Sequence, residues 1–446
     1  MAVTSDELGN KDIKSLLIKQ AVPASIGILF MSVNILVDTI FVGQWIGSLA
    51  IAAVTVVLPM TFFISSLGMA VGIGGSSVLS RALGAGNKEK AEITFANQIL
   101  MTFVLASVFV LLGIFFSDEM LLLFGAQGAI VAPAKEFFFP IIISVPFLAL
   151  SMMGNAVIRA EGKAKFAMFA MIIPAFANIL LDILFIKYLN MGMFGAALAT
   201  AISYFTCFVF ILWFFIYKSE LRLKWHHLKF NFPIVKEITS LSFVTFSRQG
   251  VVSILAIILN HTLYTYGGEH SVVIYGIISR MLMFALFPVL GITQGFLPIA
   301  GYNYGANNHK RVKETIFISI KYAAILATFI YIIILIFTRQ IVAVFTTDEI
   351  VLSETPNALR WVFAASPIIA IQLIGAAYFQ AAGKAKKALF LTLSKQGFFL
   401  IPLVLILPNF FGIFGAWIAF PISDVLSTII TYYFLNKEIK TVLTTN

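Results

Sequence analysis

The chain has 446 residues, of which 60% are hydrophobic and only 11% are charged, and its mean hydropathy is +0.99. A soluble domain carries about 25% charged residues, so this composition excludes a soluble globular protein. The formal charge of +10 indicates a nucleic-acid partner only if the basic residues form a patch, and their distribution along the chain decides that question.

Apolar stretches recur along the chain at the length of about 20 residues that a helix needs to cross a bilayer. Backbone groups in lipid must be satisfied internally, which favours helices for such stretches. The polar start has no cleavage site after it, so we expect the first helix to be retained. The predicted spans are 15–41, 49–80, 92–116, 136–158, 165–188, 193–217, 236–265, 271–303, 312–338, 356–380, 386–408 and 412–435.

Most of the 30 basic residues fall in alternate loops, whereas the loops between these are mainly acidic. The positive-inside rule makes the basic loops cytoplasmic, which places both termini in the cytoplasm and supports an even number of helices. The basic surplus therefore reflects membrane topology, and we expect no nucleic-acid partner. We predict a multi-pass protein of the cell inner membrane.

Three sequence segments return in the second half of the chain, displaced by nearly the same number of residues. A duplicated unit of six helices has both copies in one orientation, related by a pseudo-two-fold axis along the membrane normal. We therefore predict an all-α membrane protein with twelve helices in two six-helix bundles. The repeated pairs are GNAVIRAEGKAK (154–165) with GAAYFQAAGKAK (375–386), SRALGAGNKEK (80–90) with GYNYGANNHKR (301–311), and MGMFGAALATAIS (191–203) with FGIFGAWIAFPIS (411–423).

The repeat divides the chain into an N-terminal lobe (1–217), a basic cytoplasmic linker (218–235) and a C-terminal lobe (236–446). His226 and His227 fall in the linker, where we expect solvated side chains. The only cysteine, Cys207, lies in an apolar span, which excludes a disulfide and a cysteine-based metal site. Two like-oriented bundles provide the geometry of alternating access, so the repeat indicates a transporter.

Three acids remain within the predicted helices, namely Asp38, Asp182 and Asp424. An ionisable group inside a membrane is energetically expensive, which makes each of them a functional candidate. Asn34 and Asn178 precede Asp38 and Asp182 by four residues, a spacing that places amide and carboxyl on one helix face. Both pairs lie at similar depth in the first half, so we expect them to share one polar cavity.

Two carboxylates in a cavity of low dielectric cannot easily both be ionised, so Asp38 and Asp182 predict a proton site. Asparagine oxygens and a hydroxyl such as that of Thr200 offer the same site to Na⁺, because hard cations prefer oxygen ligands. The candidate sodium ligands are Asp38, Asn178 and Asp182. The alternative is that these groups only hydrogen-bond helices together. Pro23 removes a backbone hydrogen bond from the first helix and predicts a bend there.

Asp424 is the only acid within the helices of the second half, which also contains Arg248 and Lys395. A buried acid alone tends to neutralise, whereas a paired acid can remain charged. We predict a charge cluster of Asp424 with Lys395 or Arg248, which either gates the bundle or holds it together. No HExxH, GxSxG or Walker-type loop occurs, so we expect no enzyme activity and no ATP coupling.

Several of these segments together resemble the multidrug and toxic compound extrusion (MATE) family, in particular its prokaryotic DinF-like and MepA-like branches. They are RAEGKAK with QAAGKAK, VDTIFVG (37–43), SRALGAGNKEKA (80–91) and NILLDILFI (178–186). The resemblance implies a V-shaped pair of six-helix lobes that exports organic cations in exchange for H⁺ or Na⁺. It also implies a coupling network of Asp38, Asn155, Asn178, Asp182 and Thr200, with Pro23 as the bend of the first helix.

Another branch of the family uses acids on the seventh and tenth helices, where this chain has none within the membrane and carries Arg248 instead. We therefore expect coupling to rest on the first half. The resulting hypothesis is a monomeric antiporter of lipophilic organic cations that interacts with membrane lipid and needs no cofactor beyond H⁺ or Na⁺. The main alternative is a lipid-linked oligosaccharide flippase, in which Arg248, Arg280 and Lys395 would hold pyrophosphate. A passive channel is a third class.

Overall fold

The computed structural model describes residues 5–346 and 348–444, and over these residues it is helical with no strand. Among these described residues, eleven helices are long and apolar enough to cross a membrane. The longest, α9 (Phe232–Gly305), contains Gly268 with φ 65° and ψ −165°, where two helices meet. Such a positive φ is readily adopted only by glycine. Dividing α9 there yields the twelve spans that the sequence predicts.

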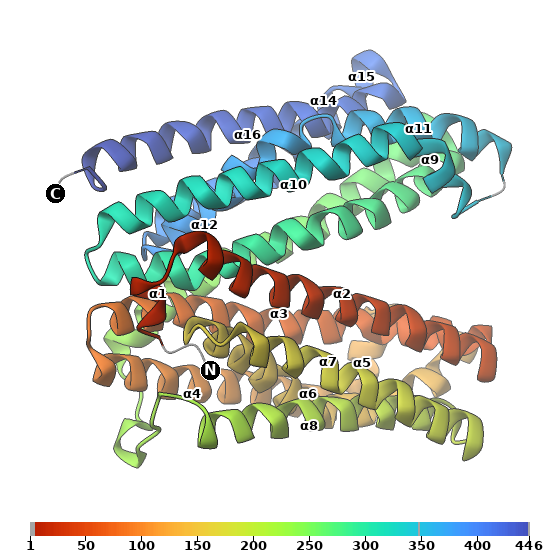
Figure 1. The fold of residues 1–446 in the computed structure, drawn as a ribbon. Coiled ribbons are helices and arrows are strands. Elements are labelled where there is room, and N and C mark those ends of the chain that lie inside the picture. The colour runs from red at the N-terminus through yellow and green to blue at the C-terminus, as the bar shows by residue number, and fades with distance from the viewer. Residues whose placement is uncertain (1–4, 347, 445–446) are drawn as a thin grey trace. The chain divides into compact units, whose positions relative to one another are not determined.

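Within each unit the long helices pack along one another (Figure 1). The short elements α1 (Glu7–Asn10), α5 (Ser117–Leu123) and α15 (Pro408–Phe411) lie outside the main spans. In the first half the spans are α2 (Ile13–Trp45), α3 (Ser48–Gly84), α4 (Lys88–Phe115), α6 (Val131–Ala160), α7 (Ala164–Asp182) and α8 (Gly192–Tyr217). The second half has α9, α10 (His309–Ala343), α11 (Glu349–Phe363) with α12 (Ile369–Ala381), α13 (Ala385–Leu393) with α14 (Ile401–Ile406), and α16 (Ile413–Thr441).

The chain forms two compact units whose boundaries lie inside helices. The first unit contains the described residues up to Glu7 together with Ile26–Thr245. The second contains Leu8–Ser25 and the chain from Phe246 onward. These boundaries differ from the predicted lobes, because residues 8–25 pack with the second unit and the linker, with the start of α9, packs with the first. The chain therefore changes unit within α2 and again within α9.

Polar contacts at the basic ends of the helices account for this exchange. In the first unit, Glu237 at the start of α9 forms ion pairs with Arg81 at 2.9 Å and Lys90 at 3.4 Å. In the second unit, Asn303 Nδ2 donates to the carbonyl oxygen of Leu8 at 2.9 Å. The sequence pattern identified the basic loops that carry these side chains. It did not predict that they bind the start of α9 and the segment at Leu8.

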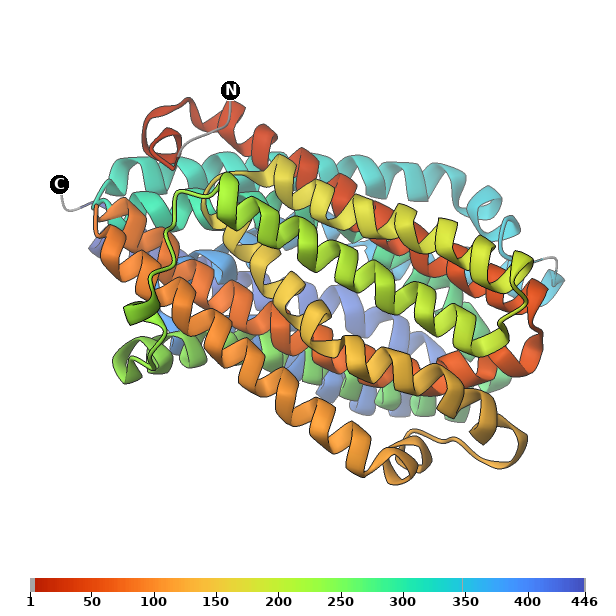
Figure 2. The same cartoon turned by 90° about the horizontal axis from the view of Figure 1, so that it is seen from below.

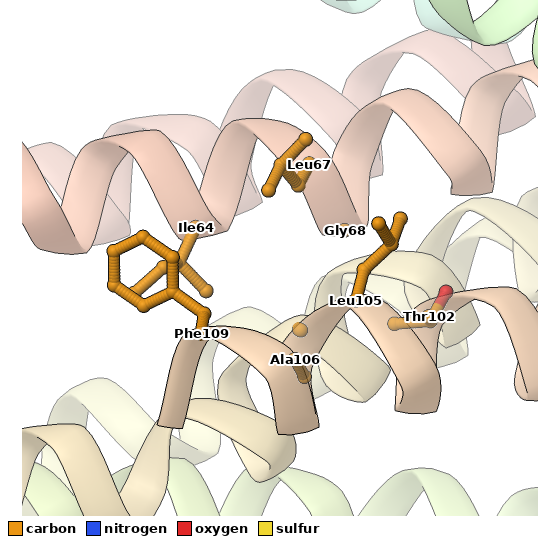
Figure 3. Close-up of a pocket in the computed structure, with 8 residues that line it drawn as sticks. Ile64, Leu67, Gly68, Thr102, Leu105, Ala106 and Phe109 are labelled. Carbon is orange, nitrogen blue, oxygen red and sulfur yellow. The ribbon is translucent and has the colours of Figure 1, made fainter. Parts of the chain in front are cut away.

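Close helix packing in the first unit depends on small residues, as the glycines of residues 65–84 suggest. A Cβ at Gly68 would lie 2.5 Å from the carbonyl oxygen of Ala149, so α3 approaches the backbone of α6 directly. A small apolar pocket opens beside this contact, between α3, α4 and α6 (Figure 3). Its lining contains one polar side chain, Thr102, and none of the predicted coupling residues.

The linker is attached to the first unit rather than free in solvent. His227 is only 4% exposed, and its Nδ1 lies 3.9 Å from Glu92 Oε2 of α4. The prediction of a solvated side chain is therefore wrong for His227, although its neighbour His226 is exposed. The linker folds back onto α4 because Glu92 and Asn97 of that helix accept hydrogen bonds from linker backbone amides.

Candidate functional site

Helices α2 and α7 of the first unit bring the two predicted Asn/Asp pairs together in register. Asn34 Nδ2 donates to Asn178 Oδ1 at 3.0 Å. Four residues further along both helices, the carboxyl groups of Asp38 and Asp182 lie within hydrogen-bonding reach of each other. The spacing of four residues on each helix thus produces two adjacent layers, one of amides and one of carboxyls.

The carboxyl layer lacks donors. Asp182 is completely buried, and neither of its oxygens accepts a hydrogen bond from any group in the described part of the chain. The same holds for Oδ1 of Asp38 and Oδ1 of Asn34. An ionised carboxylate can only accept, so a hydrogen bond between the two carboxyls requires a proton on one of them. A proton on either carboxyl would supply the donor for such a hydrogen bond.

Helix α8 adds two side chains to this coupling group. Asn178 Nδ2 donates to Thr200 Oγ1 at 3.5 Å, which places the predicted hydroxyl at the edge of the amide layer. One turn further on, Tyr204 lies within electrostatic range of Asp38. Sequence reasoning missed Tyr204, although its spacing of four residues from Thr200 places both on one face of α8.

Asn155 does not join this group. Its Nδ2 donates to the carbonyl oxygen of Ala167 at 2.7 Å, and its Oδ1 accepts from Arg159. Ala167 and Asp182 lie on the same helix about 22 Å apart, at 1.5 Å per residue. In this arrangement Asn155 therefore joins α6 to the start of α7, and the position implied by the family resemblance does not make it a cation ligand.

Pro23 lies inside α2, two residues before the last residue that packs with the second unit, Ser25. The missing N–H of proline leaves the carbonyl of Lys19 without its helical partner, which weakens the helix at this point. The sequence prediction of a bend point thus falls close to the boundary where α2 passes from one unit to the other.

The second unit pairs its intramembrane acid. Lys395 Nζ lies 2.8 Å from Asp424 Oδ1, and Asp424 is 5% exposed. The sequence left Lys395 and Arg248 as possible partners of Asp424, and the structure shows that the partner is Lys395. Arg248 forms none of the ion pairs found among the described residues. Asp424 is therefore compensated by a fixed charge of the protein itself.

Both units place a key charged side chain at a π-helical turn, which the sequence did not predict. Ile183–Tyr188 adopts π-helix directly after Asp182, and Ser394–Leu400 does so around Lys395. Segments of this kind are rare and occur often at functional sites. The wider turn changes the direction of the side chains that follow, so spacing rules based on the α-helix fail beyond these points.

The repeated segment GKAK holds the basic end of each unit through its first lysine. In the first unit, Lys163 lies 3.4 Å from Glu161, which also accepts from Ser219 of the linker. In the second, Lys384 pairs with Glu438 of α16. Glu161 lies outside the spans, and its burial raises its pKa above the ordinary value, outweighing the opposing effects of Ser219 and Lys163. These contacts indicate structural anchors at the helix ends.

The described residues contain no group of three or more His, Cys, Asp or Glu side chains that could hold a metal ion. A duplicated twelve-helix membrane protein with acids buried within its spans has the architecture of a transporter. The family model MatE matches residues 23–184 and 247–406, once in each half. The chain therefore belongs to the MATE family of transporters, which are not enzymes.

Relatives of known name agree with this assignment. The chain is 26% identical to the multidrug export protein MepA of Staphylococcus haemolyticus, covering 94% of this chain and 93% of that protein. It is 25% identical to the FAD transporter of Shewanella oneidensis, covering 94% of each. A crystal structure of a MATE protein in the bent conformation superposes with a TM-score of 0.94 at 25% identity, covering 100% of this chain and 99% of that one.

Proposed function

We propose that this protein is a secondary active exporter of lipophilic organic cations, driven by entry of H⁺ at Asp38 and Asp182. The observation that carries the proposal is the buried carboxyl pair without donors. Two acids in contact bind one proton more readily than either would alone at the same depth, because the second charge is unfavourable beside the first. The pair then exchanges its proton as a unit.

Coupling follows from competition for the same negative charge. In the deprotonated state the acid pair attracts a cationic substrate into the first unit, and protonation removes that attraction. Reciprocity of binding free energies requires that substrate and proton lower each other's affinity by the same factor. The weakened helix near Pro23 supplies a point at which α2 can bend when the charge state of Asp38 changes.

Sodium is the second candidate for the coupling ion. The unpartnered oxygens of Asn34, Asp38 and Asp182 are of the type that hard cations prefer. Proton coupling is favoured because the two carboxyls already lie within reach of each other and need only one proton to complete a hydrogen bond. We propose no other cofactor.

The charge of the site also separates the candidate substrates. Two acids without a protein cation favour a cationic drug over an anion such as FAD, the substrate in the name of the Shewanella relative. A flippase for pyrophosphate-linked lipids would need several free cations, and one of the three candidates, Lys395, is already paired with Asp424. We further propose that the protein works as a monomer in the cell inner membrane with both termini in the cytoplasm, as the basic helix ends indicate.

The test is transport in vesicles that contain the purified protein and a fluorescent lipophilic cation. Export is measured under an imposed pH gradient and, separately, under a Na⁺ gradient. We expect export driven by the pH gradient in the wild type and export at the rate of protein-free vesicles in Asp38→Asn and Asp182→Asn. The matched control is the double variant Asp424→Asn/Lys395→Met, which removes the second-unit pair and retains export. Export that persists in both first-unit variants contradicts the proposal.

A further inference from the structure

The linker between the two halves presents an exposed surface that the transport mechanism does not use. It runs from the end of α8 at Tyr217 to the start of α9 at Phe232. Its aromatic residue Trp225 is 90% exposed, and Phe232 at its end is 79% exposed. Exposed basic side chains lie among these rings: Lys218, Arg222, Lys224, Lys229 and Lys236.

The linker is held along the side of α4. The backbone N–H of Arg222 donates to Glu92 at 3.2 Å, and that of Asn231 donates to Asn97 at 2.9 Å. Asn97 lies about 13 Å along the helix axis from Lys88, the first residue of α4, at 1.5 Å per residue. The contacts at Glu92 and Asn97 are five residues apart, so the linker follows the flank of the helix for about 7.5 Å, at 1.5 Å per residue. Figure 2 shows it beside the ends of α3 and α4.

The length of α4 places this flank at the level of the lipid headgroups. Its 28 residues extend about 42 Å, whereas the hydrocarbon core is about 30 Å thick. About 12 Å of the helix, counted over both ends, therefore lies outside the core, and Glu92 lies about 6 Å from the first residue of the helix, Lys88. The linker also connects two membrane spans, so its ends begin and finish at the same interface.

The positive-inside rule accounts for the sign of the charges but not for the exposed rings. The acids near the linker are already engaged: Glu220 accepts from Ser5, Glu237 pairs with Arg81, and Glu92 pairs with Lys224 at 3.8 Å. Basic side chains therefore face outward together with Trp225, Phe230 and Phe232. Tryptophan and other amphipathic rings prefer the membrane interface, and basic clusters at the membrane surface attract anionic lipids.

We propose that the linker is a binding surface for anionic phospholipid headgroups of the leaflet that surrounds the basic helix ends. The rings of Trp225, Phe230 and Phe232 insert among the headgroups. Arg222 and Lys229 contact their phosphates. Attachment of the linker to α4 holds this surface in place, so that the first unit is anchored to the leaflet through a rigid element.

The test uses a fluorescent label next to the proposed anchor. The background variant Cys207→Ser removes the only cysteine, and His226→Cys then carries the label on an exposed position beside Trp225. The protein is placed in vesicles of phosphatidylcholine alone or mixed with phosphatidylglycerol, with a quencher on the lipid headgroup. We expect stronger quenching in the mixed vesicles, and a label that is unquenched in both overturns the proposal.

Charge removal provides the second arm. In Arg222→Gln/Lys229→Gln, the preference for phosphatidylglycerol should fall about fivefold for each charge removed, since each basic residue near the surface contributes to attraction of acidic lipid. The matched control, Lys310→Gln/Lys386→Gln, removes two exposed basic residues from the basic helix ends of the second unit and should leave the quenching unchanged. An equal decrease in both double variants contradicts a specific linker surface.

Discussion

The two units handle buried charge in opposite ways on the same repeated scaffold. In the second unit, Asp424 has its own fixed cation, since Lys395 lies 2.8 Å away. In the first unit, Asp38 and Asp182 contact each other, and three of their four oxygens lack a donor among the described residues. An acid whose charge is balanced by a lysine needs no other cation. A pair of acids without such a lysine can bind a mobile cation such as H⁺.

This difference explains how a duplicated protein can carry one coupling site. A buried ion pair is costly to break and therefore holds one state. Two acids that share a proton change charge without losing a protein partner, so they can respond to a gradient. The two bundles of the repeat therefore differ in charge: a lysine compensates the buried acid of the second, whereas the buried acids of the first have no such ion pair among the described residues.

The largest expected effect on stability is at the second-unit pair. Asp424→Asn leaves Lys395 as an uncompensated cation within the membrane and should lower the free energy of unfolding by about 3–5 kcal/mol. The measurement is thermal unfolding of the detergent-solubilised protein. The double variant Asp424→Asn/Lys395→Met should recover most of that loss. A single variant as stable as the wild type would show that the ion pair is not formed.

The contacts of Glu161 test whether loss of an ion pair also destabilises the first unit. The quantity compared is the decrease in the free energy of unfolding on substitution. Glu161→Gln removes the partner of buried Lys163 and should lower the free energy of unfolding by about 1–3 kcal/mol. Because burial raises the pKa of Glu161, the native protein binds its proton more tightly than the unfolded chain. Its contribution to stability is therefore largest at acidic pH, and it falls as the pH rises through the raised pKa.

The check is the difference in melting temperature between wild type and Glu161→Gln, followed from acidic to neutral pH. We expect the advantage of the wild type to decrease over that range, because the glutamine side chain does not titrate. An advantage that grows with pH would mean that Ser219 and Lys163 dominate over burial. That result would reverse the assigned direction of the pKa shift.

A smaller effect is expected in the amide layer beside the acids. Asn34→Ala removes one hydrogen bond, to Asn178 at 3.0 Å, and should cost about 0.5–1.5 kcal/mol. Gradient-driven export should be retained, because the carboxyl pair stays intact. The measurement combines thermal unfolding with the vesicle assay. Complete loss of export in a folded Asn34→Ala protein would place the amide among the essential cation ligands.

The smallest effect is expected for Asp182→Asn on stability. No protein cation loses its partner, so the change in the free energy of unfolding should stay within about 1 kcal/mol even though export is lost. The measurement is thermal unfolding of Asp182→Asn and Asp424→Asn under the same conditions, which compares the stability that each variant loses. A loss as large as that of Asp424→Asn would reveal a hidden partner of Asp182 and remove the basis of the comparison.

The sequence was sufficient for most of the fold because lipid imposes strong rules. Apolar length and basic loops predict the twelve spans, and the repeat predicts two bundles. The sequence did not reveal the exchange of residues 8–25 between units, since that depends on contacts such as Asn303 with Leu8. The span predicted at 356–380 is interrupted at Ser366–Ile368, where a proline begins a short 3₁₀ turn.

The sequence predicted those contacts of the site that follow from the spacing of residues along one helix. It could not predict contacts that depend on how distant helices pack. The spacing of four residues placed Asn34 with Asp38 and Asn178 with Asp182, and the structure brings all four together. Spacing could not choose between Lys395 and Arg248 as the partner of Asp424, because that choice depends on how α9 and the π-helical turn at 394–400 pack. For the same reason, Asn155 was assigned to the network by resemblance, whereas its side chain bonds to Ala167.

The most direct test of the central claim is the number of protons released when a lipophilic cation binds. The purified protein in weakly buffered detergent is titrated with the cation, and the pH change is recorded for the wild type, Asp182→Asn and Asp424→Asn/Lys395→Met. We predict proton release by the wild type and by the second-unit double variant, and none by Asp182→Asn. Release that persists in Asp182→Asn, or that disappears only when the second-unit pair is removed, would contradict the assignment of ion exchange to the first unit.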